Sequence, residues 1–366
     1  MHSIYYTICA NCIAPELKMP LTNNPTINDS NQEELSLAEK IFGILQIDQF
    51  SPFKPTFFTN KELSELSKTS RILYCLAKPE LDARKLLSHV VLGEQDKAEA
   101  MIKANPKLLL IRTKAVDYSG RTIIGTAFQG ALGAGDKPMW NMMLPYLESL
   151  EKGEALRQFH EQFPNGIEDD VLAEQLKDYY NALALAIINH ADHGQSAIEE
   201  FRQGITSQKE IEQGKHFNLQ HLLAAYQAYI DNFDALTTWD NRDLFWKKVI
   251  GYVQRQMTAY DAQVHCSGVK SVLDNENAFK RLFGFCNGGE FFPLSVDSGL
   301  GFDFGCYSVA GRYAVALLGL TLSLLASAAW VGRGLLKSYV ERKQMCLLDL
   351  ESHLSKECTI SPVNYS

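Results

Sequence analysis

Cysteine is sparse in this sequence and is not arranged as a disulfide framework. Eight cysteines are spread over 366 residues, without the even, close spacing of small secreted disulfide-rich domains. Cys9 and Cys12 have the separation of half a zinc site, but no second Cys or His pair follows at finger-like spacing. The cysteines therefore favour reduced thiols in a cytosolic setting, and we expect no metal.

Positive charge is also scarce at the N-terminus, where a signal peptide carries it, and it is not gathered as in nucleic-acid-binding proteins. No Lys or Arg precedes Lys18, and the apolar run at 4–14 is interrupted by Thr7 and Asn11, so the sequence does not predict a cleaved signal peptide. The formal net charge is −8 and the basic residues are scattered. A nucleic-acid-binding protein normally carries a basic patch or stripe, so we expect no nucleic-acid partner.

Familiar catalytic motifs are missing as well. The sequence has no nucleotide-binding loop, kinase signature or serine-nucleophile elbow. His190 and His193 have a spacing that suits one face of a helix, but no third metal ligand is evident. The adjacent pair His265 and Cys266 does not itself make a nucleophile–base dyad. We expect no catalytic residue and no cofactor; an enzyme with an unrecognised Cys/His or acidic site remains an alternative.

Helical periodicity dominates what is present, and the fold class expected is mainly α. The middle third contains three amphipathic stripes whose apolar and aromatic residues recur every three or four positions, which predicts helices with these side chains in the core. Extended chain is expected only around 108–124. The three stripes are Leu172, Leu176, Tyr179, Leu183 and Ile187; Leu219, Leu222, Tyr226, Tyr229 and Phe233; and Phe245, Val249, Tyr252 and Met257.

A capping signal marks an earlier helix. Thr59 and Glu62 have the spacing of a capping box, which predicts that a helix begins there. The leucines that follow fit one helix only if it bends or breaks near 68–70. Pro79 is expected to end it, and another helix is expected to run from Asp82 to about Gly93.

These signals predict seven segments. They are a flexible N-terminal segment at 1–33, an F-box-like helical segment at 34–82, an ankyrin-like helical region at 83–150, a central helical domain at 151–283, a Gly/Phe-rich loop at 284–311, an apolar helix at 312–336 and an amphipathic tail at 337–366.

The segment Tyr313–Gly332 is apolar and long enough to cross a bilayer. Its 20 residues contain no charge, and as a helix they would span roughly 30 Å. Small residues lie on one face, which predicts a close helix partner. Basic residues beyond 336, Lys343 among them, would suit anionic head groups. The alternative is a fully buried helix in a soluble domain. The seam of small residues is Ala316, Gly319, Ser323 and Ser327.

The stretch from Asp117 to Leu144 resembles an ankyrin repeat. Thr126-Ala-Phe-Gln129-Gly-Ala131, followed by Gly135 and Asp136, is similar to the ankyrin pattern Thr-Pro-Leu-His-x-Ala-x-x-x-Gly. The proline and histidine of that pattern are replaced here by Ala127 and Gln129. The resemblance implies paired helices that bind proteins, with a degenerate partner repeat upstream at 86–102.

The segment 59–79 is similar to the second half of an F-box, in which a leucine-spaced helix leads into a Ser/Thr-Ser-Lys/Arg turn. This resemblance implies binding to the Skp-type adaptor of cullin ubiquitin ligases. The Pro-Glu opening of the motif is absent, and an ordinary helical hairpin is the alternative.

Segments at 86–110, 117–121 and 217–257 resemble those of Legionella-type effectors secreted by the Dot/Icm type IV system. The resemblance implies translocation into a host cell, with a cytosolic body and possible membrane association. We therefore expect a non-enzymatic, membrane-associated interaction adaptor; the F-box-type adaptor is the alternative. The residues expected to contact a partner are Leu63, Leu66, Leu73, Gln129 and Trp140.

Overall fold

A computed structural model describes residues 58–69, 71–167, 172–189, 194–283 and 323–359. These residues are mainly helical, as the periodicity of the sequence predicts. The chain divides into two compact units, Met1–Lys85 and Leu86–Ser366. The N-terminal segments expected before residue 58 and the Gly/Phe-rich loop at 284–311 lie outside the described residues.

In the first unit, helix α3 (Asn60–Thr69) begins at the predicted capping box. The Thr59 amide donates to the Glu62 carboxylate at 2.7 Å, and the Glu62 amide donates to Thr59 Oγ1 at 3.2 Å. Helix α4 (Arg71–Val91) follows, and its residues from Leu86 onward belong to the second unit. The end of α3 at Thr69 and the start of α4 at Arg71 confirm the predicted break near 68–70.

The expectation that Pro79 ends a helix is wrong, because α4 continues through Pro79 to Val91. Proline has no N–H to donate to the carbonyl one turn earlier, so the helix forgoes one hydrogen bond there. Ala77 and Ala83 are buried on either side of the proline. Burial of the helix on both sides outweighs the missing bond, and the helix expected from Asp82 is part of α4.

The second unit opens with a strand hairpin between helices. After α5 (Gln95–Ala104) and a short 3-10 turn, strand β1 (Thr113–Val116) pairs antiparallel with β2 (Thr122–Gly125), which confirms extended chain within 108–124. Strand β3 (Glu210–Ile211) adds to β2 in parallel. The expectation of extended chain only around 108–124 is therefore wrong for this strand, whose two residues are too few to show an alternating pattern. Buried side chains on this sheet pack against the end of α4 in a small cluster: Leu87, Val91, Ala115, Ile123 and Ile211.

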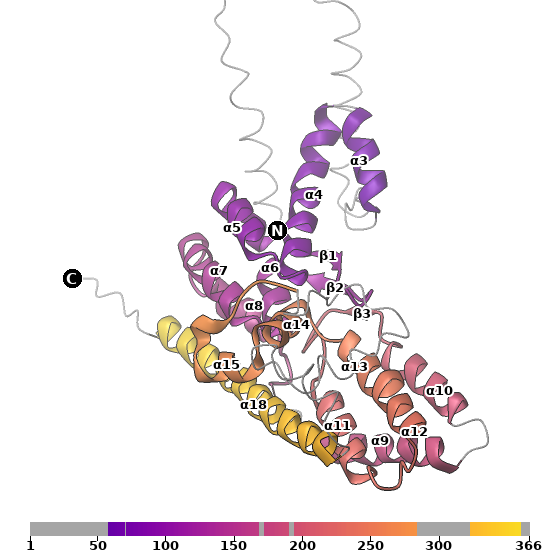
Figure 1. Cartoon of the computed structure of the whole chain (residues 1–366). Coiled ribbons are helices and arrows are strands. Elements are labelled where there is room, and N and C mark those ends of the chain that lie inside the picture. The colour runs from indigo at the N-terminus through magenta and orange to yellow at the C-terminus, as the bar shows by residue number, and fades with distance from the viewer. Residues whose placement is uncertain (1–57, 70, 168–171, 190–193, 284–322, 360–366) are drawn as a thin grey trace, which may run out of the picture. The chain divides into compact units, whose positions relative to one another are not determined.

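From α6 to residue 283 this unit is mainly helical (Figure 1). Its larger core lies among the helices from α9 (Leu172–Asn189) onward, together with the last helix of the chain. The aromatic stripes lie in this core as predicted, with one correction: in α9 the buried tyrosine is Tyr180, whereas Tyr179 is 42% exposed. The described helices and helical turns of this stretch are α6 (Ala127–Ala134), α7 (Lys137–Leu150), α8 (Glu154–Gln162), α9 (Leu172–Asn189), α10 (Gln195–Ile205), α11 (Gln220–Asp231), α12 (Trp239–Phe245), a π-turn at Trp246–Ile250, α13 (Gly251–Arg255), α14 (Ala259–Ser267), α15 (Val269–Asp274) and a 3-10 turn at Glu276–Ala278.

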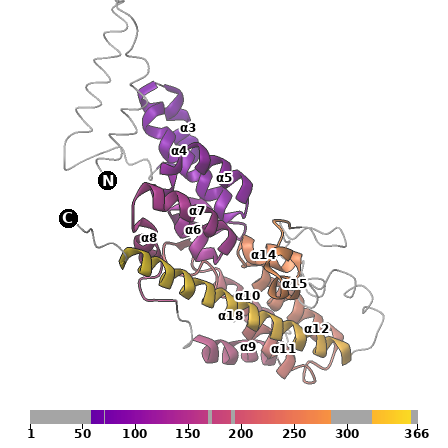
Figure 2. The ribbon, with the colours of Figure 1, turned by 90° about the vertical axis from the view of Figure 1, so that its left-hand side faces the viewer.

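The last described element is α18 (Ser323–Thr359), a helix of 37 residues that lies alongside α8, α11 and α15 (Figures 1 and 2). It runs without interruption across residue 336, where the sequence suggests a change from apolar helix to amphipathic tail. Its buried residues lie on one face, at spacings of three or four positions except for a gap of eight that the partly buried Lys343 divides in two. They are Leu336, Tyr339, Leu347, Leu350 and Leu354.

Among the residues that the structure describes, no helix is long and apolar enough to span a bilayer. The predicted apolar segment lies only partly within them: 313–322 are outside, and α18 begins at Ser323. Ala316 and Gly319 of the small-residue seam are therefore outside the described residues. Ser323 and Ser327 lie within α18, but their side chains are not described.

Candidate functional site

The turn between α6 and α7 is the most tightly specified local structure in the ankyrin-like region. Thr126 caps α6 by accepting from the Gln129 amide at 3.1 Å, and the Gln129 side chain accepts from the Thr126 amide at 3.0 Å. Gly135 ends α6 in the left-handed conformation, at φ 68°. Asp136 then caps α7 by accepting from the Met139 amide at 3.1 Å. Capping at both ends fixes the two helices as a pair.

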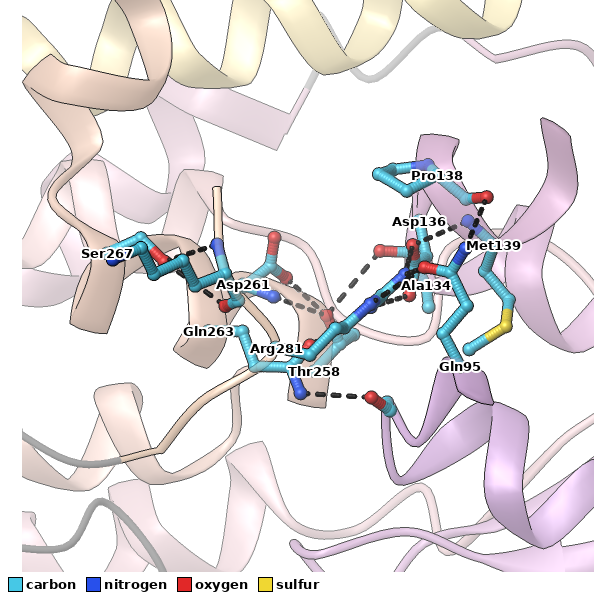
Figure 3. A network of polar contacts seen from close by, with 12 residues as sticks. Gln95, Ala134, Asp136, Pro138, Met139, Thr258, Asp261, Gln263, Ser267 and Arg281 are labelled. Carbon is cyan, nitrogen blue, oxygen red and sulfur yellow. Dashed lines mark hydrogen bonds and ion pairs between the residues drawn. The ribbon is translucent and has the colours of Figure 1, made fainter. Parts of the chain in front are cut away.

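Arg281 joins this turn to two other helices (Figure 3). Its two terminal nitrogens bind both carboxylate oxygens of Asp136, at 2.6 and 2.7 Å. The same guanidinium donates to Gln95 of α5 at 2.8 Å and to Gln263 of α14 at 3.0 Å. Gln263 in turn donates to the carbonyl of Gly93 at 3.0 Å. Arg281 therefore connects α5, α7 and α14 through a bidentate, charge-assisted contact.

Asp261 of α14 lies at the centre of a second set of contacts and is fully buried. One of its carboxylate oxygens accepts from Lys343 Nζ at 2.5 Å and from the Tyr339 hydroxyl at 2.8 Å, both from α18. The other accepts from Thr258 Oγ1 at 2.7 Å. Lys343 also donates to the carbonyl of Ala134, at the end of α6, at 2.9 Å. We call Asp261, Lys343, Tyr339 and Thr258 the Asp261 cluster.

Lys343 reaches this position because Gly135 has no side chain. A Cβ at residue 135 would overlap Cε of Lys343, so a side chain there would collide with the lysine. The positive φ of Gly135 independently disfavours any other residue. Lys343, which was expected among anionic lipid head groups, thus lies against the α6–α7 turn. Its charge is paired with that of Asp261.

Buried histidines flank the Asp261 cluster, and burial holds them neutral. Burial lowers the pKa of His216 to about 3, with the Arg121 charge adding to the effect. Burial also lowers the pKa of His265 to about 4, although its Nδ1 lies 2.7 Å from the Asp261 carbonyl, a contact that acts in the opposite direction. Neither imidazole is a poised base at neutral pH.

Cys266, next to His265, has the properties of a structural thiol. Burial raises its pKa to about 12, whereas a nucleophilic cysteine needs a lowered pKa. His221 lies 3.1 Å from the Tyr180 hydroxyl and stacks on Phe217, which accounts for it as a packing residue. Among the residues that the structure describes, these contacts bring together no Cys–His–acid set around Cys266.

In the portion of the chain that is described, no three His, Cys, Asp or Glu side chains come close enough to hold a metal ion. His190, His193, Cys9 and Cys12 lie outside that portion.

The residues predicted to contact a partner are mostly core residues. Leu63, Gln129 and Trp140 are at most 2% exposed, and Leu73 is half-buried. The Leu66 side chain is not described. Gln129 is occupied by its capping contacts and by Glu161, 3.1 Å away. The described apolar positions of the F-box-like and ankyrin-like motifs lie mostly in the core, so a partner-binding surface would consist of the exposed residues beside them.

The sequence pattern did not predict the contacts that organise this region, although Asp136 was part of the ankyrin-like motif and Lys343 was expected near lipid head groups. Asp136 had a local signal, since an Asp directly after a C-terminal helix glycine suits the cap of the next helix. Lys343 had one too, because it falls seven positions from both Leu336 and Leu350, in the buried seam of α18. Asp261 and Arg281 had no local signal that paired them with residues so far away in the sequence.

The chain is similar to a protein of Coxiella burnetii. The chain is 27% identical over 240 residues to an uncharacterized protein of Coxiella burnetii, an alignment that covers 61% of this chain and 63% of that protein. The chain thus spans less than two thirds of that relative's length. No family model matches, and no solved structure matches.

Proposed function

We propose that the protein is a non-enzymatic adaptor that binds another protein through its ankyrin-like region after translocation into a host cell. The observation that carries the proposal is the order β1–β2 hairpin, α6, α7, with both helices capped. Ankyrin-type units consist of a turn and two helices, and their loops on one face commonly bind partners. The sequence resemblance to Dot/Icm substrates supports the host-cell part of the proposal.

The hairpin carries exposed apolar side chains that suit a partner contact. Val116, at the end of β1, is 56% exposed, and Tyr118, in the turn, is 41% exposed. Lys114 and Val116 lie on the outward face of β1, opposite the buried Thr113 and Ala115. Apolar side chains that remain exposed beside charged ones are common at the edges of protein interfaces.

The test is affinity purification of the tagged full-length protein from cross-linked animal cells. Val116→Asp is expected to lose most of the co-purified proteins. Leu185→Asp, which alters another exposed aliphatic residue (47% exposed) on α9, is the matched control and is expected to retain them. If both variants retain the same proteins, the hairpin is not the contact surface. If the wild type enriches nothing over an unrelated tagged protein, the adaptor proposal fails.

Membrane association through Tyr313–Gly332 is a second part of the proposal and has its own test. Deleting everything after residue 305 would also remove α18 and with it Lys343 and Tyr339, so a truncation would damage the fold. Leu317→Arg together with Leu320→Arg instead adds two charges to the apolar segment. Resistance to carbonate extraction is expected for the wild type and loss of it for the double variant. Identical extraction of the two would contradict the membrane contact.

An F-box-type adaptor is the alternative, and one observation favours it. The capped helix α3 ends at Thr69 and α4 begins at Arg71, which is the helix-then-turn order that the F-box resemblance implies. Co-purification of the Skp-type adaptor, lost on Leu66→Asp combined with Leu73→Asp, would support this alternative. Absence of the Skp-type protein from wild-type purifications would exclude it.

A further inference from the structure

A polar groove of about 620 Å³ lies over α11 in the second unit. Helix α11 packs against both α9 and α18 (Figure 2). All three helices contribute residues to the lining. Apolar side chains in the lining are Leu223, Ala224 and Val340. The volume falls within the range of sites that hold small ligands or a few side chains of a peptide.

Three cationic side chains line this groove. Arg333 and Lys337 come from neighbouring turns of α18, and Lys177 comes from α9. Arg333 is the informative one, because its Nε is buried and has no hydrogen-bond partner among the described residues. A buried, unpaired donor of a charged group is costly, and the Arg333 side chain as a whole is only partly buried, so its guanidinium can take an acceptor that enters the groove.

The two acidic side chains in the lining already have partners. Asp231 accepts from the amide of Gln227 at 2.5 Å. Glu341 lies 3.8 Å from Lys337, and both side chains are more than 60% exposed, so this ion pair is weak and easily exchanged. The unpaired donor of Arg333 therefore favours a negatively charged acceptor, beside an apolar strip and glutamine amides that suit a peptide backbone.

We propose that this groove binds an acidic, partly apolar peptide segment of the partner protein, with a carboxylate on Arg333 and Lys337. This inference rests on the proposed adaptor function and specifies the chemistry of its partner. Helix α11 is roughly 16 Å long from Gln220 to Asp231, so the groove matches a segment of about five extended residues or three helical turns. The formal net charge of the chain, −8, disfavours an acidic ligand at a distance. Binding therefore depends on these local cations.

Fluorescence anisotropy with the full-length protein tests the proposal. The probe is a labelled twelve-residue peptide of glutamate and leucine, and its counterpart has glutamine in place of glutamate. The glutamate peptide is expected to bind at least about tenfold more tightly than the glutamine peptide. Arg333→Gln combined with Lys337→Gln is expected to weaken glutamate-peptide binding by at least about tenfold, because each charge-assisted contact contributes more than a neutral hydrogen bond.

The matched control removes two positive charges elsewhere. Lys270→Gln combined with Lys280→Gln alters exposed lysines that do not line the groove, and Lys270, like Lys337, pairs with a carboxylate four residues on. The affinity of this control variant for the glutamate peptide is expected to differ from that of the wild type by less than about twofold. Circular dichroism and urea unfolding establish that each variant folds.

Three results would overturn the proposal: no binding of the glutamate peptide to the folded wild type, equal losses in the two double variants, or equal affinity for the glutamine peptide. The outcome is separable from that of the adaptor proposal, because Val116→Asp leaves the groove intact. If Val116→Asp loses co-purified proteins but the peptide does not bind, the adaptor function stands and the groove assignment falls.

Discussion

Replacing Lys343 with methionine is expected to lower the free energy of unfolding by about 3 kcal/mol. The change keeps an unbranched aliphatic chain but removes the hydrogen bonds to Asp261 at 2.5 Å and to the Ala134 carbonyl at 2.9 Å. Asp261 is fully buried and would retain only its contacts with Tyr339 and Thr258. Removing one partner of a buried pair typically costs about 3–5 kcal/mol. We take the lower end because the Lys343 side chain is 16% exposed.

Urea unfolding followed by tryptophan fluorescence measures this effect in the second unit alone, because all four tryptophans lie beyond residue 86. Lys337→Met is the matched control on the same helix. Its side chain is 61% exposed and lies 3.8 Å from Glu341. Exposed pairs of this kind contribute less than about 1 kcal/mol.

A double-mutant cycle identifies the cause of the loss. If the unpaired Asp261 carboxylate is responsible, Asp261→Asn should make Lys343→Met less harmful, with a coupling energy of about 2 kcal/mol. The reasoning is refuted if Lys343→Met alone costs less than about 1 kcal/mol. It is also refuted if the two changes are additive within about 0.5 kcal/mol.

Three further predictions concern the surroundings of the Asp261 cluster. Gly135→Ala should cost about 1–3 kcal/mol from its positive φ alone, and more from the collision with Lys343; an unchanged urea midpoint would contradict the close approach. The His216 pKa lies below its ordinary value of 6.5 at about 3. Between those values the unfolded chain therefore binds the extra proton and stability falls as pH falls, by about 1.4 kcal/mol per pH unit. His216→Asn should reduce the slope of the free energy of unfolding against pH in this range, by an amount that corresponds to at most one bound proton. An unchanged slope would show that His216 is not held neutral. Cys266, whose pKa is raised to about 12, should react with iodoacetamide at least about tenfold more slowly in the native protein than in urea, as measured by mass spectrometry; equal rates would restore the thiol-nucleophile alternative.

The features predicted from the sequence were those that arise from neighbouring residues. The capping box at Thr59 and Glu62, the break after Thr69 and the aromatic core of the central helices each depend on residues within a few positions of one another. The prediction that Tyr179 is the buried tyrosine of α9 was wrong, since Tyr180 is buried instead. Both positions keep a spacing of three or four to Leu176 and Leu183, so periodicity alone does not decide between them.

The Asp261 cluster and the Arg281 contacts could not be predicted in this way. Lys343 and Asp261 are 82 positions apart, and Arg281 and Asp136 are 145 apart. A charged residue on a helix is usually solvated, and only the tertiary fold decides that Lys343 faces inward. The groove over α11 depends on the packing of three helices, so its lining has no single pattern in the sequence.

The position of Lys343 in the seam of α18 has a consequence for the register of that helix. Leu336 and Leu350 lie seven residues before and after it, so a shift of α18 by one heptad would exchange a leucine for the lysine at the same place. In an entirely leucine-lined seam, such slipped arrangements would pack almost equally well. Here the shift would place a leucine against the Asp261 carboxylate and bury the ammonium group among apolar side chains. The ion pair thus distinguishes one alignment of a long, repetitive helix from its near-equivalents, as a single buried polar residue does in a coiled coil.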